Sequence, residues 1–294
     1  MTTTEFVDLV RDLVADPAQA PRLQFLLAQQ TRLIVERLTD EPFSARVEFS
    51  DEELVRRVAA YEELVNPLGR AAALAGAWVP RAAAQTWPPL VGALANARDR
   101  LNGVSVWLDL YLYPALLVQY AFSIGAVAAR RYDNLASLLT APVVEDRQRW
   151  RPAMLYLHNQ SVLDHRLAQR LPGLERRHTP MSDHLVEVLR PWFADALVDD
   201  RLYEREFDRY EVFAGLVYLD LESPEPRGWT PVGRYAWRGR DGGGVDEEVL
   251  NEAALAGLDW PPLMAGLFRG SVERLAEVTK AYATHLASVR GQLW

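Results

Sequence analysis

Histidines and aspartates, which can bind a metal ion, gather in the middle of the chain. Four of the five histidines fall within 27 residues, and two aspartates accompany them: His158, Asp164, His165, His178, Asp183 and His184. Imidazole and carboxylate groups are common ligands of transition metals. One hypothesis is therefore an enzyme with a metal-dependent active site on a helical framework, for which there are four candidate residues: His158, Asp164, His165 and His184.

The spacing of these residues differs from that of known metal motifs. No HExxH sequence occurs, and His158 and His165 are seven residues apart rather than three or four. Pro152 and the polar stretch 159–161 also argue against one continuous helix that would place both rings on one face. Exposed or hydrogen-bonded histidines are the simpler interpretation, so we predict no metal and no cofactor.

A second group of residues interleaves basic and aromatic side chains late in the chain. Its members are Arg227, Trp229, Arg234, Tyr235, Trp237 and Arg238. Such a pattern can stack bases and bind phosphates in single-stranded nucleic acid. It can also pin a loop through its own cation–π contacts, or supply the Trp, Tyr and Arg anchors of a protein interface. We prefer the last interpretation and predict that these six residues contact a protein partner.

Composition narrows the chemistry. The chain has 32 basic and 40 acidic residues among 294, a formal net charge of −8, which disfavours strong binding to nucleic acid. It has no cysteine, which excludes disulfides, thiolate zinc sites and a cysteine nucleophile. Lys280 is its only lysine, and neither a GxSxG sequence nor a P-loop occurs. No reaction follows from these residues.

The stretch from Val104 to Ala129 is apolar enough to be considered for a membrane span. Asp109, Pro114 and Gln119 are costly in lipid unless they face protein. A buried helix of a large helical domain explains the same pattern. The N-terminus has no basic segment followed by an apolar run, so there is no secretory signal. We therefore expect a cytoplasmic protein without a membrane segment.

Most of the chain has the periodicity and the punctuation of helices. Ser50 with Glu53 three residues later predicts a capping box, and Pro67 predicts an interruption of the helix that follows. Ser182 is predicted to cap another helix. Residues 200–221 carry one apolar stripe. The most apolar part, Val104 to Leu139, predicts a central helical hairpin in which glycine and alanine allow close approach.

The fold class that follows is mainly all-α: an irregular multi-helix bundle with this very apolar central hairpin. Residues 147–157 and 262–293 are predicted to be helical. One short non-helical or β-like insertion, a strand or an ordered loop, is expected at about 223–244, where prolines and glycines interrupt the pattern. We predict a single domain over residues 1–294, with a soft subdivision near Pro142.

Three stretches together resemble a known type of region: residues 61–68, residues 106–132 and residues 229–238. They are similar to an uncharacterised helical region that follows an effector or nucleotide-handling domain in some bacterial multidomain proteins, including predicted antiphage defence proteins. The resemblance covers the chain from about residue 20 onward and rests on aromatic and proline landmarks. It implies a sensing or binding role but carries over no catalytic residue.

This sequence departs from the pattern of those multidomain proteins in one respect, because no effector domain is recognised before or after the helical region. Either a separately encoded partner supplies the effector, or the chain is part of a longer protein. We therefore predict a non-catalytic helical protein that binds or senses another protein and regulates a partner effector in bacterial defence. Self-association into a homo-oligomer is compatible with this role. The enzyme built on the histidines and a nucleic-acid-binding protein are the alternatives.

Overall fold

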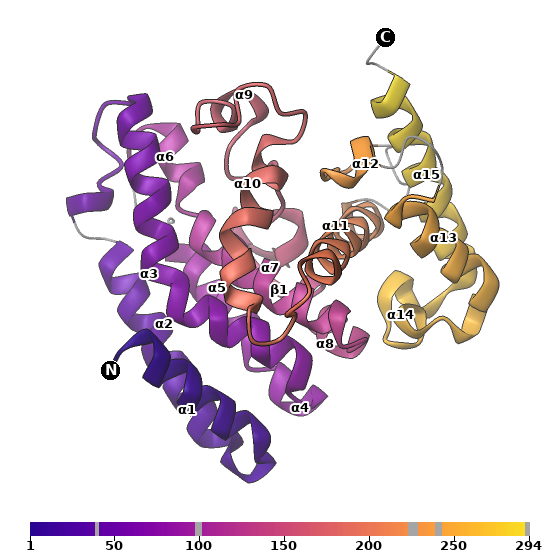
Figure 1. Ribbon diagram of the computed structural model, residues 1–294, viewed down its shortest axis with the longest axis horizontal. Coiled ribbons are helices and arrows are strands. Elements are labelled where there is room, and N and C mark those ends of the chain that lie inside the picture. The colour runs from indigo at the N-terminus through magenta and orange to yellow at the C-terminus, as the bar shows by residue number, and fades with distance from the viewer. Residues whose placement is uncertain (39–40, 98–101, 223–228, 239–242, 292–294) are drawn as a thin grey trace.

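The chain is mainly α-helical, as its periodicity predicts, with one short antiparallel hairpin of two strands (Figure 1). The computed structural model describes residues 1–38, 41–97, 102–222, 229–238 and 243–291. The elements are α1 (Thr3–Ala15), α2 (Ala20–Leu38), α3 (Asp51–Trp78), α4 (Arg81–Ala84), α5 (Trp87–Ala95), α6 (Ser105–Leu110), α7 (Tyr113–Ala128), α8 (Tyr132–Leu139), β1 (Pro142–Asp146), β2 (Arg149–Pro152), α9 (His165–Ala168), α10 (Pro180–Leu189), α11 (Asp200–Glu222), α12 (Tyr235–Arg238), α13 (Val245–Ala256), α14 (Pro261–Met264) and α15 (Val272–Gly291). Short 3₁₀ turns join some of them: η1 (Pro17–Gln19), η2 (Glu41–Phe43), η4 (Ala153–Leu155), η5 (Arg190–Phe193), η6 (Gly257–Asp259) and η7 (Leu267–Gly270).

Helix α7 is the centre of the core, and every residue from Tyr113 to Val127 is buried. Helix α3 packs along it, and α5 and α11 cover other sides. A Cβ atom at Gly76 of α3 would lie 1.9 Å from the carbonyl oxygen of Phe122. One at Gly125 of α7 would lie 2.2 Å from a backbone oxygen of α3. The close helix approach predicted from small residues is therefore confirmed.

The apolar stretch that includes α6 and α7 passes a length and hydropathy test for a membrane span, but the 18-residue window that passes it is entirely buried inside the protein. This is what a core helix of a soluble protein shows. The residues that argue against lipid have protein partners: Pro114 occupies the first turn of α7, where no amide hydrogen is needed, and Gln119 donates to the carbonyl oxygen of Leu157 at 2.7 Å.

Helix α3 corrects two details of the prediction. Ser50 caps it, accepting from the amide of Glu53 at 3.1 Å, but the Glu53 carboxylate binds Arg56 and Arg57 rather than reaching back to the cap. The helix also continues through Pro67 to Trp78 instead of stopping there. Proline inside a helix removes one hydrogen bond. Burial of the following turns against α7 offsets that loss, so tertiary packing overrides the local rule.

The predicted helix over 147–157 is wrong, because this region contains the β1–β2 hairpin. Arg147 and Gln148 form its two-residue turn with φ angles of 48° and 66°. Positive φ at both central residues is the geometry that matches the twist of a two-residue hairpin. The outer edge of β1 is covered by the Asn96 side chain, which bonds the carbonyl oxygen of Val143 at 2.9 Å and the amide of Glu145 at 3.0 Å.

The non-helical stretch expected at 223–244 is an ordered loop rather than a strand in its described part. Residues 229–234 are irregular, and the helical turn α12 follows. The helix predicted over 262–293 is divided into α14, η7 and α15. Positive φ angles break it at Gly266 (97°), Phe268 (54°), Arg269 (58°) and Gly270 (64°).

Helix α11 joins the two parts of the bundle. It lies between the N-terminal helices and the group formed by α13, α14 and α15 (Figure 1). Most of its residues from Tyr203 to Asp220 are buried. The buried hydrophobic residues from Phe6 in α1 to Leu286 in α15 form one connected cluster. Because α11 is covered on so many sides, its polar side chains meet several other elements, and these contacts build the sites described next.

Candidate functional site

His158 is a buried core residue. Its ring contacts Tyr218 and Trp229 edge-on, with centroids 5.3 and 5.8 Å away. Its Nδ1 atom accepts from the amide of Gln160 at 3.3 Å. Burial lowers the pKa of His158 to about 4, because the charged form loses its hydration. The ring is therefore neutral at neutral pH.

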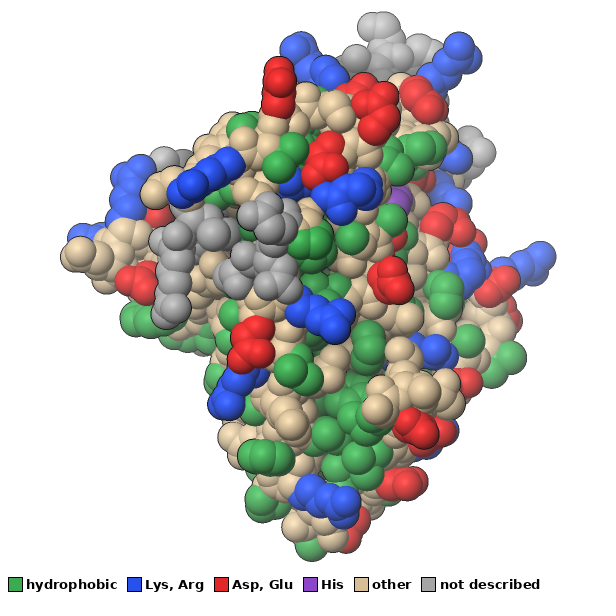
Figure 2. All heavy atoms as spheres, turned by 90° about the vertical axis from the view of Figure 1, so that its left-hand side faces the viewer, with side chains coloured by type: hydrophobic (Ala, Val, Ile, Leu, Met, Phe, Trp, Pro, Cys, Tyr) green, Lys and Arg blue, Asp and Glu red, His purple; other side chains and the backbone are tan. Residues whose placement is uncertain are grey.

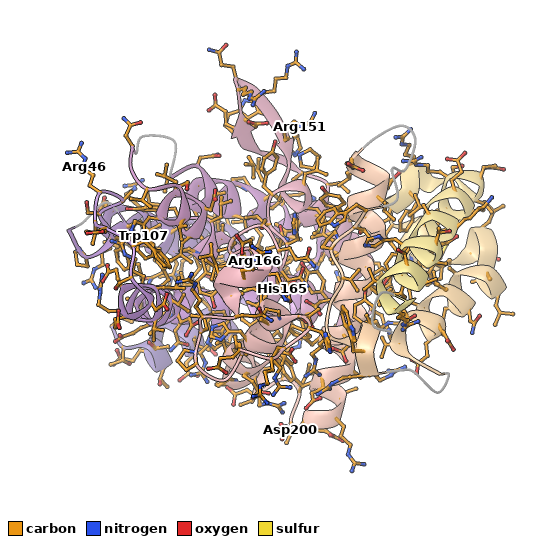
Figure 3. The ribbon with its side chains drawn as sticks, turned by 90° about the horizontal axis from the view of Figure 1, so that it is seen from above. Arg46, Trp107, Arg151, His165, Arg166 and Asp200 are labelled. Atoms are coloured by element: carbon orange, nitrogen blue, oxygen red, sulfur yellow. The ribbon has the colours of Figure 1, made fainter. Side chains whose placement is uncertain are left out.

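The other three candidates of the enzyme hypothesis have separate local partners. Asp164 caps α9 by accepting from the amide of Leu167 at 2.9 Å. His165 begins α9 and is exposed (Figure 3). His184 of α10 pairs with Glu62 of α3, with 2.7 Å between Nε2 and Oε1.

The predicted cluster therefore does not converge. Its members bond or pack with different neighbours, and the described residues contain no group of three or more His, Cys, Asp or Glu placed to hold a metal ion. His165 and His178 do line one cavity, together with Asn159 and Ser182, but its volume is only about 20 Å³. That is enough for one molecule the size of water.

A buried carboxylate, Glu211 of α11, organises the polar contacts behind this cavity. Its Oε1 accepts from the Tyr120 hydroxyl at 3.1 Å and from the Asn159 amide at 3.0 Å, and its Oε2 accepts from the Ser182 hydroxyl at 2.6 Å. Burial raises the pKa of Glu211 to about 7, although the hydrogen bond from Ser182 opposes this. We call Glu211 with Tyr120, Asn159 and Ser182 the Glu211 node.

The Glu211 node holds the 229–234 loop in place. Asn159 also donates to the carbonyl oxygen of Val232 at 3.1 Å, and the Ser182 hydroxyl accepts from the amide of Arg234 at 3.0 Å. A Cβ atom at Gly233 would lie 1.8 Å from the Glu211 carboxylate, so only glycine fits. Ser182 therefore bonds this node rather than capping α10, which begins two residues earlier at Pro180.

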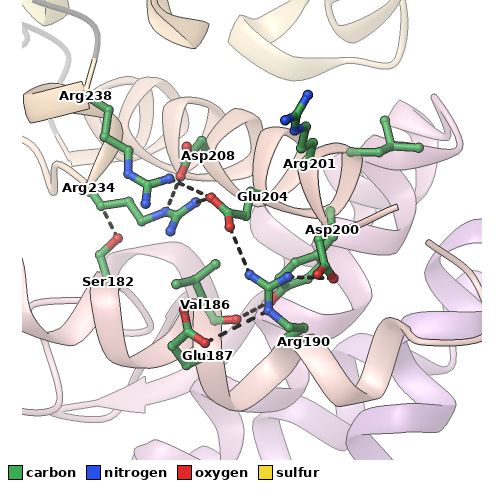
Figure 4. A network of polar contacts seen from close by, with 12 residues as sticks. Ser182, Val186, Glu187, Arg190, Asp200, Arg201, Glu204, Asp208, Arg234 and Arg238 are labelled. Atoms are coloured by element: carbon green, nitrogen blue, oxygen red, sulfur yellow. Dashed lines mark hydrogen bonds and ion pairs between the residues drawn. The ribbon is translucent and has the colours of Figure 1, made fainter. Parts of the chain in front are cut away.

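Arg234 belongs to a network of ion pairs on α11 rather than to an open surface (Figure 4). It is 4% exposed, and its guanidinium donates to Asp208 at 2.7 Å and to Glu204 at 2.8 Å. Arg238 and Arg190 reach the same Glu204 carboxylate, at 2.6 and 3.0 Å. These hydrogen bonds, that from Arg238 first, hold the pKa of Glu204 at about 2, whereas burial raises the pKa of Asp208.

The rest of the basic and aromatic segment also packs on its own protein. The Tyr235 hydroxyl pairs with that of Tyr282 in α15. Trp237 is half-buried and stacks on the His178 ring, with centroids 5.5 Å apart. Trp229 and Arg238 keep exposed surface. Arg227 lies outside the described residues. At Arg234 and Tyr235 the structure therefore agrees with the interpretation of a loop held in place by its own internal contacts.

The sequence interpretation missed a different basic and aromatic surface, at the tip of the β1–β2 hairpin. Trp150 is 59% exposed, and Arg147, Arg149 and Arg151 around it are exposed as well. The hairpin projects from the helices (Figure 3), so these side chains stand clear of the body. We call these four residues the hairpin surface.

Two arginines of the hairpin surface form no ion pair among the described residues, although Asp146 lies opposite Arg149 across the strand pair. Among the residues that the structure describes, no carboxylate lies within 4.0 Å of Arg147 or Arg149, whereas Arg151 bonds Tyr156. The sequence signal for this surface was the run Arg-Gln-Arg-Trp-Arg after two valines and between Pro142 and Pro152. Its turn lacks the glycine or asparagine that usually marks a two-residue hairpin, and for this reason the sequence pattern predicted a helix over 147–157 instead.

The face of the N-terminal helices differs from the hairpin surface. In Figure 2 its acidic and basic side chains are intermixed, with apolar side chains gathered in the lower half. Helix α2 exposes Phe25 and Leu33, at 72% and 50%. A cavity of about 260 Å³ between α1, α2 and α4 is lined mostly by apolar residues, with Asp16, Gln24 and Thr86 as its polar ones. Comparison of the chain with models of protein families, with curated proteins and with solved structures finds no match.

Proposed function

We propose that this chain is a non-catalytic protein that recognises another protein through the hairpin surface. The observation that supports this most is the exposed Trp150, flanked by Arg147 and Arg149 without internal partners, on a hairpin that projects from the body. Tryptophan and arginine dominate the residues that contribute most to protein interfaces. A projecting pair of strands can enter a groove that a flat helical face cannot reach.

The energetics of Trp150 favour a partner. Covering the exposed part of its ring would stabilise a complex by about 3 kcal/mol, taking about 25 cal/mol for each Å² of apolar surface removed from water. Arginines on an edge strand have another use, since charge discourages strand pairing between molecules. That purpose would be served by a charged or polar residue at position 150 and does not account for the tryptophan.

The charge around the hairpin favours a protein over a polyanion. The hairpin carries three arginines on its turn and β2 and two acidic residues, Glu145 and Asp146, on β1, with Asp146 opposite Arg149, so the local excess is a single positive charge. The whole chain carries −8. Binding to nucleic acid depends on neutralising many phosphates. We therefore place nucleic acid second, as an outcome that the test below can reveal.

The biological setting is carried by the sequence resemblance alone. A helical region of the kind found in some predicted antiphage defence proteins would sense a partner while a separate effector acts. On that basis we propose a cytoplasmic protein whose partner is an effector of bacterial defence, or a protein that signals to one. The scattered histidines lend no support to the enzyme alternative, because His158 is buried against Tyr218 and Trp229, His184 pairs with Glu62 and His165 is exposed.

Affinity purification of tagged variants from the native host tests the proposed surface. Wild type should recover a partner, and Trp150→Ala or the double change Arg147→Glu with Arg149→Glu should lose it. Phe25→Ala is the matched control, since it removes an even more exposed ring from α2. Partners retained by the hairpin variants, or lost equally with Phe25→Ala, would contradict the proposal. Recovery of nucleic acid in place of protein would support the second alternative.

A further inference from the structure

A second surface feature, independent of the hairpin, is a groove on the far side of α11. It lies where the start of α8 meets α13 and α14, which are neighbours of α11 (Figure 1). Its volume is about 530 Å³, within the range of small-molecule sites in proteins. One wall is apolar and one end is polar, so the groove can discriminate between the two ends of a ligand.

The apolar wall comes from α13, α14 and the residue between them. Leu255 and Ala256 end α13, and Trp260 and Pro261 begin the next turn. Leu255 is 90% exposed, which is costly in water. The Trp260 ring is buried beneath, stacked between Phe213 and Phe268. This wall is therefore a fixed apolar floor with an exposed leucine at its edge.

The polar end of the groove contains hydrogen-bond donors that have no acceptor among the neighbouring described side chains. Arg209 is 1% exposed and binds the Glu252 carboxylate through both of its terminal nitrogens, yet its Nε has no partner among the described residues. The Tyr132 hydroxyl accepts from Arg130 at 3.1 Å and from Arg209 at 3.5 Å. Because it accepts both, its own O–H remains able to donate.

Arg130 has the most available charge in the groove. Its nearest carboxylate, Glu206, is 3.8 Å from Nη2, which is beyond hydrogen-bond distance. Its side chain is 47% exposed. The backbone of Arg130 is left-handed, with φ of 58°, where α7 ends with a bond from the amide of Arg131 to the carbonyl oxygen of Ala126. Glycine is the usual residue at such a position.

An arginine in a strained position that suits glycine points to a use for its side chain. The residues that line the groove carry two positive charges, on Arg130 and Arg209, and one negative charge, on Glu252, while the buried Glu206 lies 3.8 Å from Arg130 outside the lining. Three side-chain groups at the polar end have donors left over: the guanidinium of Arg130, the O–H of Tyr132 and Nε of Arg209. Glu252, the one carboxylate among the residues that line the groove, is bound by Arg209.

We propose that this groove binds a small organic anion with an apolar body. Its carboxylate sits against Arg130 and Tyr132, and its apolar body lies against Leu255, Ala256 and Pro261, above the buried Trp260. This ligand site is separate from the hairpin surface and stands or falls independently of it. A ligand bound here would touch α8, α11, α13 and α14 together and so would stabilise their packing.

Titration with 4-phenylbutyrate, followed by calorimetry and by saturation-transfer NMR of the ligand, tests the proposal. The neutral analogue 4-phenylbutyramide and inorganic phosphate are the comparison probes. We expect the carboxylate to bind at least 10-fold more tightly than either, since only it satisfies both the polar end and the apolar wall. Equal affinity for the amide, or no saturable binding of the carboxylate, would overturn the proposal.

Arg130→Gly separates binding from folding. Glycine suits the left-handed backbone, so the variant should unfold at the same temperature as wild type or higher, while affinity for 4-phenylbutyrate falls at least 10-fold. Arg166→Gln, an exposed arginine on α9 (Figure 3), is the matched control and should leave the affinity unchanged. Unchanged affinity in Arg130→Gly would overturn the assignment of the groove.

Discussion

Replacing the buried carboxylate of the Glu211 node should change how stability depends on pH. In the native state the pKa of Glu211 is raised from 4.5 to about 7, chiefly by burial. In the unfolded chain the same group ionises near its ordinary value. Between these two pH values the native state therefore binds a proton that the unfolded state has released. It follows that Glu211 makes the protein less stable as pH rises from about 4.5 to about 7.

The size of this effect follows from the two pKa values. At 1.36 kcal/mol for each pKa unit, the change from 4.5 to about 7 corresponds to about 3 kcal/mol of unfolding free energy. Glutamine at position 211 has no proton to lose, so Glu211→Gln removes this dependence. The variant should gain about 3 kcal/mol relative to wild type between pH 4.5 and pH 8, whatever its stability at the starting pH.

Urea unfolding of both proteins across this pH range measures the difference. Asp183, Glu206 and Asp208, whose pKa values burial also raises, are present in both proteins, so their contributions largely cancel. Glu187→Gln, on an exposed part of α10, serves as the control and should follow wild type. If the curves of Glu211→Gln and wild type stay parallel, or converge in the opposite direction, then the account of a buried, protonated Glu211 is wrong.

Two further predictions concern packing and ion pairs. Arg234→Ala leaves the buried Asp208 without its counter-charge and should lower the unfolding free energy by about 3–5 kcal/mol. Arg238→Ala removes a half-exposed side chain and should lower it by no more than about 1 kcal/mol. Urea unfolding measures both changes. Gly76→Ala forces a methyl group into the backbone of α7 and should cost about 1–3 kcal/mol or more in thermal unfolding, whereas Gly291→Ala, with open space around it, should be neutral or slightly stabilising.

Comparison of each variant with its control shows which result would contradict the prediction. Equal small losses for the two arginines would mean that Asp208 is hydrated or neutral rather than paired. A neutral Gly76→Ala would mean that α3 and α7 are farther apart than the structure has them.

Much of the helical framework could be predicted because helices follow from the spacing of apolar residues that are close together in the sequence. The apolar stripe of α11 and the very apolar α7 follow from which faces must be buried, and the close approach at Gly125 follows from the small residues of α7, whereas Gly76 of α3 was not predicted. Rules based on neighbouring residues failed where contacts with residues distant in the sequence had a larger effect on the structure. Pro67 stays inside α3 because α7 covers the turns that follow it.

The functional surfaces were harder to predict, because exposure depends on partners that are remote in sequence. Arg234 and Arg149 are both arginines followed by an aromatic residue, but Asp208, 26 residues earlier, pairs with the first in the protein interior. The second has Asp146 opposite it across the strand pair but forms no ion pair among the described residues. The histidines illustrate the same limit, since Glu62 binds His184 across 122 residues.

Site-specific photocrosslinking at the hairpin tip tests the central claim most directly. A photoreactive phenylalanine derivative is placed at position 150, or at position 25 as the control, in otherwise wild-type protein in the native host, and the adducts are identified by mass spectrometry. We predict one dominant protein adduct at position 150 that is absent at position 25 and that disappears when Arg147 and Arg149 are changed to glutamate. The same adducts at both positions, or no protein adduct at position 150, would contradict recognition through the hairpin surface.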